Sequence, residues 1–104
     1  MIIATTISVN KVKIRLTDER WKHIVLLHPG LVDSQSVILS TVKNPDYVFA
    51  GGGGELLATS KIFGNHYIVV VYKETSKDGF TITAYETNDT KWLFKKKIIW
   101  SRVS

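Results

Sequence analysis

Short stretches in which apolar and polar side chains alternate predict the strands of this chain. Residues 12–16 (VKIRL) alternate aliphatic with cationic side chains, a pattern typical of an edge strand. Gly64-Asn65 lies between two apolar stretches, and this dipeptide favours the tight turn of a hairpin. The strands predicted with most support are residues 12–16, 55–63, 66–73 and 80–87.

A helical spacing of apolar residues follows the first of these strands. Thr17 is suited to cap a helix, and Pro29-Gly30 ends the pattern. A second helix is predicted for residues 34–42, before Asn44-Pro45. The inward residues expected on the two helices are Trp21, Ile24 and Val25, and then Val37, Ile38 and Thr41.

Two further segments complete the predicted fold. Residues 47–50 are expected to form a short strand, and residues 95–100 either an edge strand or a short helix. The fold class is α+β, with two N-terminal helices packed on an antiparallel four-stranded sheet with meander topology. A single domain over residues 1–104 is expected, in which residues 1–11 are an N-terminal extension and residues 88–104 a basic C-terminal tail.

Composition narrows the classes of function. The chain has 104 residues, a net charge of +5 and no cysteine, which excludes disulfides, a thiolate zinc site and a cysteine nucleophile. A basic protein favours polyanionic partners such as RNA. The cations concentrate near the end of the chain, where they are either an RNA contact or a solvated tail: Lys91, Lys95, Lys96, Lys97 and Arg102. No signal peptide or apolar run of membrane-spanning length is visible, so a cytoplasmic protein without a membrane partner is expected.

His28 is the first candidate for chemistry. It follows Trp21 by seven residues, which places both on one helix face, whereas His23 is expected to face solvent. An imidazole exchanges protons near neutral pH. The alternative is a core histidine that bonds the carbonyl groups at its own helix end. His23 and His28 are five residues apart and cannot chelate one ion together, so no metal site is predicted.

Hydroxyl side chains in the last predicted strand are the second candidate. Alternation places Phe80, Ile82 and Ala84 against the helices, and it places four residues on the outer face, Thr81, Thr83, Tyr85 and Thr87. The alternative is that threonine and tyrosine simply favour strands. In an earlier strand, Lys61 is the only cation and shares one side with Leu57, Thr59 and Phe63. It is either a phosphate contact or a solvated edge lysine.

Three segments resemble one family of nucleases. RLTDERWKHIVLLHPGL, NPDYVFAGGGGELLATSKIFGNHYIVVVYKE and DGFTITAYET are similar to the phage and toxin nucleases of the barnase–EndoU–colicin E5/D–RelE group, over residues 12–87. The resemblance implies a small metal-independent endoribonuclease with no cofactor, built from helices followed by a four-stranded antiparallel sheet. It also implies RNA as substrate and an antitoxin or immunity protein as a further partner.

The resemblance also implies roles for individual residues. The histidine of the His-Pro pair is His28, the strand lysine is Lys61, and the last-strand hydroxyls are Thr83 and Thr87; these four are the expected catalytic residues. The expected RNA-binding residues are Tyr85, Lys91, Lys95 and Lys97. Leu27 stands where such families often have an arginine, which removes one phosphate contact. The alternatives are a non-catalytic RNA- or protein-binding module of the same fold, or a component held by a partner such as an antitoxin.

Overall fold

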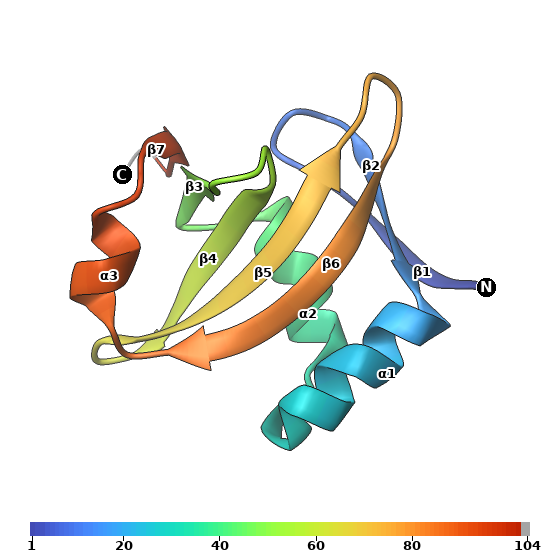
Figure 1. Ribbon diagram of the computed structural model, residues 1–104, viewed down its shortest axis with the longest axis horizontal. Coiled ribbons are helices and arrows are strands. Elements are labelled where there is room, and N and C mark those ends of the chain that lie inside the picture. Colours follow the sequence, from blue (N-terminus) through green and yellow to red (C-terminus); the bar gives the residue numbers. More distant parts are fainter. Residues whose placement is uncertain (103–104) are drawn as a thin grey trace.

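A seven-stranded mixed sheet with three α-helices is the architecture of this α+β protein (Figure 1). It is seen in a computed structural model that describes residues 1–102; the last two residues of the predicted tail lie outside the described residues. The elements are β1 (Ile2–Ile7), β2 (Lys13–Thr17), α1 (Asp18–Leu27), a short 3-10 helix η1 (Pro29–Leu31), α2 (Gln35–Lys43), β3 (Tyr47–Ala50), β4 (Leu56–Phe63), β5 (His66–Glu74), β6 (Gly79–Thr87), α3 (Thr90–Phe94) and β7 (Ile98–Ser101).

The predicted fold class, two N-terminal helices on a four-stranded antiparallel sheet, is wrong. The strand order is β1-β2-β6-β5-β4-β3-β7, and β2 runs parallel to β6 through the pairs Ile14↔Gly79 and Arg15↔Phe80. Residues 1–11 contribute β1, which pairs with β2, and the basic segment contributes α3 and β7, which pairs with β3. Local patterning predicts strands but not their neighbours, and the β2–β6 pairing joins segments more than sixty residues apart.

Both predicted N-terminal helices are present, and their ends follow from local chemistry. The Thr17 hydroxyl accepts a hydrogen bond from Arg20 N at 3.3 Å and so caps α1. Within α2 the buried residues are Ile38, Thr41 and Val42, whereas Val37, predicted to face inward, is 45% exposed. The buried stripe of α2 is shifted because this helix packs against β1 as well as β4 and β5. No helix within residues 1–102 has the length and apolar character needed to cross a membrane.

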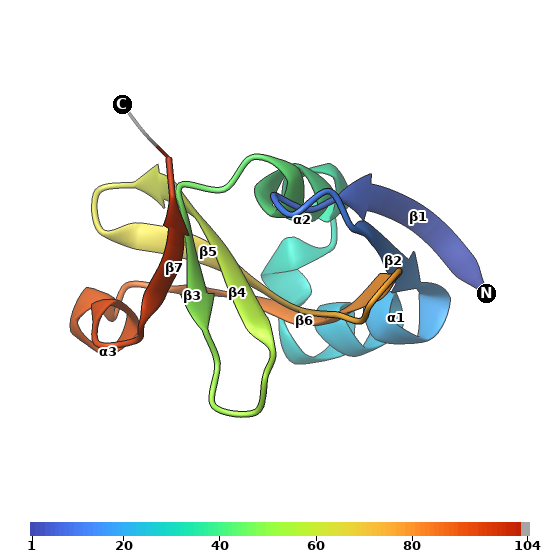
Figure 2. The same ribbon diagram turned by 90° about the horizontal axis from the view of Figure 1, so that it is seen from above.

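The sheet carries a hydrophobic core on each of its faces. Helices α1 and α2 cover one face, where Ile68, Val70 and Tyr72 of β5 are buried. The alternate side chains, such as Val69, join a second core that Leu93 of α3 completes. Helix α3 and β7 lie at one end of the sheet, and α1 and β1 lie at the other (Figure 1, Figure 2).

A β-bulge in β6 decides which hydroxyls face outward. The β5–β6 register passes from Tyr72↔Thr81 to Val71↔Thr83, so Ile82 has no partner in β5. Thr81 was predicted on the outer face, but it is 1% exposed and lies opposite Tyr72 of the first core. Phe80, predicted to pack on the helices, instead lies opposite the exposed Lys73. Simple alternation failed here because the extra residue reverses the direction of the side chains before the bulge relative to those after it.

Candidate functional site

Four side chains from three parts of the chain form a continuous row on the surface. The ring centroids of His28 and Tyr85 are 6.1 Å apart, and those of Tyr85 and Trp92 are 6.4 Å apart. Lys96 Nζ then lies 4.7 Å from the centroid of the Trp92 ring. We call these four residues, His28, Tyr85, Trp92 and Lys96, the aromatic row. It combines a proton-exchanging group, two stacking surfaces and a cation.

The end of α1 places His28 at the start of this row. Buried Ile24 anchors the helix, and the backbone N–H of His28 donates to Ile24 O at 2.8 Å. Strand β2 pairs with only Gly79 and Phe80 of β6, and α1 packs along β6. The His28 side chain is half-buried and forms no hydrogen bond within residues 1–102, unlike the core histidine of the alternative interpretation.

Tyr85 and Thr83 reach the row from β6, just after the bulge. They lie on one face, roughly 7 Å apart along the strand. Burial raises the pKa of the Tyr85 phenol above its ordinary value of 10, so at neutral pH this group is a hydrogen-bond donor. The Thr83 hydroxyl forms no hydrogen bond within the described part of the chain and is free to bind a ligand oxygen.

Thr87 occupies the same face but has a structural partner. Its Oγ1 accepts a hydrogen bond from Asp89 N at 3.1 Å. The Asp89 carboxylate in turn accepts from Trp92 N at 3.0 Å and so caps α3. Thr87 therefore shapes the turn that brings Trp92 beside Tyr85, whereas the resemblance implied a catalytic role for it.

Lys61 lies apart from the other predicted catalytic residues. It pairs across β4–β5 with Tyr67, which pairs across β5–β6 with Thr87. Two strand spacings and two residues along the strand put its Cα roughly 12 Å from that of Tyr85. Lys61 is exposed, and with Asp46, Tyr67 and other residues it lines a separate pocket of about 360 Å³. Strand β5 therefore lies between Lys61 and the strand that carries Tyr85.

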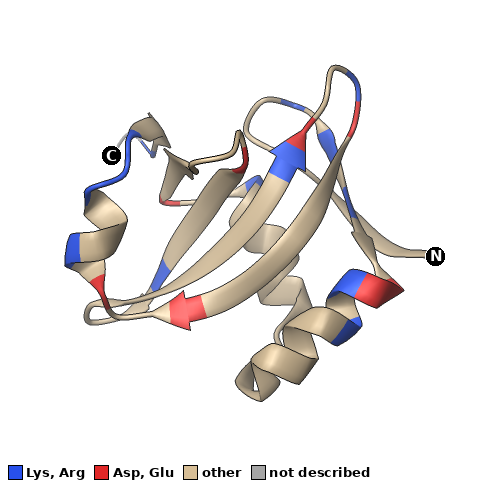
Figure 3. Ribbon diagram, in the orientation of Figure 1, with Lys and Arg blue, Asp and Glu red and all other residues tan. Residues whose placement is uncertain are grey.

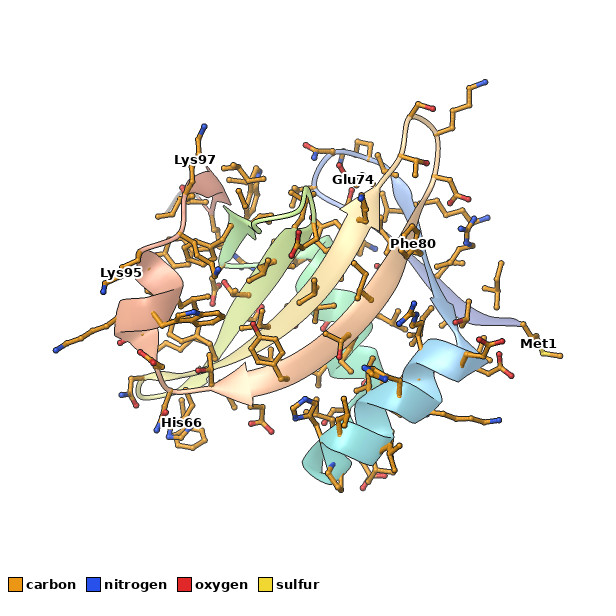
Figure 4. All side chains as sticks on the ribbon, in the orientation of Figure 1. Met1, His66, Glu74, Phe80, Lys95 and Lys97 are labelled. Atoms are coloured by element: carbon orange, nitrogen blue, oxygen red, sulfur yellow. The ribbon has the colours of Figure 1, made fainter. Side chains whose placement is uncertain are left out.

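The predicted RNA-binding lysines surround α3 without joining the row. Lys91, Lys95 and Lys97 are all exposed. Lys95 and Lys97 extend from the segment between α3 and β7 (Figure 4), and Figure 3 shows basic residues along α3 and this segment. The lysine that belongs to the aromatic row is Lys96, which lies over the Trp92 ring and was not among the predicted site residues.

Trp92 was also missed by the predictions. The available signal was Asp89, whose side chain can cap a short helix that contains Trp92. Lys96 lies two residues beyond the end of α3, so its contact with Trp92 does not follow from helical spacing. The segment was interpreted as a tail, so the capping signal was not used.

No group of three or more His, Cys, Asp or Glu side chains within residues 1–102 is placed to hold a metal ion. Comparisons with protein-family models, curated proteins and solved structures find no match to this chain. The nuclease resemblance therefore rests on the sequence motifs alone, and the functional argument rests on the site geometry.

Proposed function

We propose that this protein is an endoribonuclease that binds single-stranded RNA along the aromatic row and cleaves it with His28 as the proton-transfer group. The observation that carries the proposal is the half-exposed imidazole of His28 beside the Tyr85 ring, 6.1 Å between centroids. RNA bases stack on aromatic side chains, and a neighbouring cation attracts the phosphates. The row supplies both kinds of contact next to a group that exchanges protons near neutral pH.

The proposed reaction needs only the 2′-hydroxyl of RNA as nucleophile. His28 accepts the proton of the 2′-hydroxyl while the 2′-oxygen forms a bond to the adjacent phosphorus. The bond from phosphorus to the 5′-oxygen breaks on the opposite side of the phosphorus, and that oxygen takes a proton from water, while the His28 imidazolium returns its proton to the solvent. The products are a 2′,3′-cyclic phosphate and a 5′-hydroxyl. Thr83 and the neutral Tyr85 phenol donate hydrogen bonds to the phosphate oxygens as negative charge develops.

The remaining predicted residues act on neighbouring nucleotides in this proposal. Lys61 lines a separate pocket and binds a neighbouring phosphate, and Thr87 positions the turn before α3. Lys91, Lys95 and Lys97 attract the RNA through its charge. The resemblance adds an antitoxin or immunity protein as a further partner, for which the aromatic row is the surface to be covered.

A non-catalytic RNA-binding protein is the second candidate. It is favoured by one observation: Lys61, the predicted catalytic lysine, lines a separate pocket and is not part of the aromatic row. In that case the row binds bases and phosphates without cleaving them.

Cleavage of RNA in EDTA separates these candidates. The purified protein is incubated with single-stranded RNA and with DNA of the same sequence, and the product ends are identified by mass spectrometry. We expect RNA to yield 2′,3′-cyclic phosphate or 3′-phosphate ends and DNA to remain intact, because DNA lacks the nucleophile. A His28→Ala preparation controls for contaminating ribonuclease. Activity that disappears in EDTA and returns with Mg²⁺ would contradict the proposal, and RNA binding without cleavage would favour the second candidate.

A further inference from the structure

A second concave site lies away from the aromatic row, where the β1–β2 loop, the end of α2 and β7 meet. It is a pocket of about 530 Å³, and none of the four residues of the row lines it. The side chains that matter here are Lys11, Lys43, Trp100 and Arg102. Three cations and one indole thus surround a volume suited to a small ligand.

The charge of this pocket is positive and largely uncompensated. Within residues 1–102, no Asp or Glu lines it. Lys11 and Lys43 are exposed, and neither forms a salt bridge within residues 1–102. Arg102 has one weak ionic contact, with its Nε 3.7 Å from Asp46 Oδ1. The pocket therefore favours an anion, and three cations in its lining suit the oxygens of a phosphate.

Arg102 is held in a defined position, unlike a free surface arginine. Its Nη2 donates to Asn44 O at 2.7 Å, just after the end of α2. Its backbone N donates to Asp46 O at 2.9 Å. These bonds tie the residue that follows β7 to the α2–β3 connection, so the guanidinium is fixed before any ligand arrives.

Trp100 adds an aromatic surface to the cations. It lies on β7, opposite Val48 of β3, and its side chain is half-buried at the wall of the pocket. Stacking of a base on an aromatic ring is a recurrent way to bind nucleotides, with phosphates held by nearby Lys and Arg. An inorganic anion alone makes no use of the indole.

A neighbouring pocket continues the surface past Arg102. Arg102 also lines the 360 Å³ pocket that contains Lys61, Tyr47 and Tyr67. The two pockets thus share Arg102, and each contains a lysine and an aromatic ring, with the Asp46 carboxylate also lining the second. A strand of more than one nucleotide could therefore contact a cation and an aromatic ring in each of the two pockets beside Arg102.

We propose that the pocket between α2 and β7 binds a nucleotide, with its phosphate on Lys11, Lys43 and Arg102 and its base against Trp100. In a strand, the phosphate of the next nucleotide lies toward Lys61. This site binds by contacts that take no part in the proposed cleavage, so it holds whether or not the protein cuts RNA.

Binding of three probes tests the site. Affinities for inorganic phosphate, for AMP and for a short single-stranded 2′-O-methyl RNA, which has no nucleophilic hydroxyl, are measured by calorimetry or fluorescence anisotropy. The variants are the pair Lys11→Gln/Lys43→Gln and the single change Trp100→Leu. The control is Lys77→Gln, an exposed lysine in the β5–β6 turn that lines neither pocket. Circular dichroism and thermal unfolding establish that each variant is folded.

The expected result is tighter binding of AMP or of the RNA strand than of phosphate. Trp100→Leu should weaken it roughly fivefold or more. For the strand, the double lysine variant should also lower the slope of log affinity against log salt by roughly 0.7 per lost contact. Loss confined to the strand identifies a nucleotide within RNA, and loss with AMP identifies a free nucleotide. The proposal would be overturned if neither AMP nor the RNA strand bound more tightly than phosphate, or if the pocket variants bound every probe as Lys77→Gln does.

Discussion

The rings of His28 and Tyr85 lie 6.1 Å apart, centroid to centroid, although His28 directly follows α1 and Tyr85 lies in the last third of β6. The contact exists because α1 packs along β6 where β2 no longer pairs with it. The proposed function depends on this contact. The proposal can be tested by comparing variants of two residues of the same type, one inside the site and one outside it.

We predict that His28→Ala lowers the rate of RNA cleavage by roughly 10²–10⁴-fold, the usual contribution of a general acid–base group. His23→Ala is the matched control, because His23 is exposed on another face of α1 and should retain wild-type activity. The measurement is the single-turnover cleavage rate of a labelled RNA. Equal rates for both variants would remove His28 from the mechanism.

The two outward threonines of β6 should differ in kind. Thr83→Val removes a hydroxyl with no hydrogen-bond partner in the described structure, so it should lower turnover and leave thermal stability near that of wild type. Thr87→Val removes the acceptor of the Asp89 N–H and should lower stability by about 1 kcal/mol. Chemical denaturation and cleavage rates measure the two effects. The reverse pattern, with turnover lost only in Thr87→Val, would return the catalytic role to Thr87.

Lys96 should contribute more to RNA binding than the exposed lysine beside it. Its Nζ lies 4.7 Å from the centroid of the Trp92 ring, whereas Lys95 is exposed and was a predicted RNA contact. We expect Lys96→Gln to weaken binding of single-stranded RNA several-fold more than Lys95→Gln, because only Lys96 joins a base-stacking surface to a charge. Fluorescence anisotropy at several salt concentrations measures both variants. Equal losses would mean that the cations act only through net charge.

Tyr72→Phe should stabilise the protein by about 1 kcal/mol, because the Tyr72 hydroxyl is buried without a hydrogen-bond partner among the described residues. Burial also raises the pKa of the Tyr72 phenol. In the unfolded chain this phenol loses its proton near pH 10, whereas in the folded protein it does so only at higher pH. The free energy of unfolding therefore falls as the pH rises above about 10. The wild type should therefore lose more stability than Tyr72→Phe between neutral and strongly alkaline pH. Denaturant unfolding across this range checks both statements, and a destabilised Tyr72→Phe would indicate an unobserved partner for the hydroxyl.

Gly79→Ala should destabilise the fold by about 1–3 kcal/mol through overpacking. A Cβ at this position would lie 2.6 Å from Lys73 O and 2.5 Å from Ile14 Cδ1, at the point where β2 joins β6 in parallel. Gly52→Ala is the control, since a Cβ there meets no atom within 4 Å. Thermal unfolding of the two variants gives the comparison. Equal stabilities would show that the backbone and side chains at the β2–β6 junction can shift to accommodate a methyl group at little cost.

Much of the local structure was predictable because it rests on neighbouring residues. The Thr17 cap, the Pro29 stop and the Gly64-Asn65 turn act over a few positions, and the predicted helices and strands lie at or near their observed bounds. His28 lies just beyond α1 with φ −135° and ψ 73°, so its contact with Tyr85 does not follow from helical spacing alone. The bulge at Ile82 was not predictable in this way, because it depends on how β6 pairs with β5.

The sequence by itself determined the positions of α1, α2 and β2 to β6, although β1 and α3 were missed. It also determined which residue types are present for chemistry: one histidine at the end of a helix, hydroxyls in a strand, and cations near the end of the chain. The tertiary structure decided which of them meet. In the folded protein His28 contacts Tyr85, and Trp92 and Lys96 lie beside them. Lys61 instead lines another pocket with Arg102. The physical reason is that propensity and capping act within a few residues, whereas strand order, register and helix docking are set by burial of the whole core.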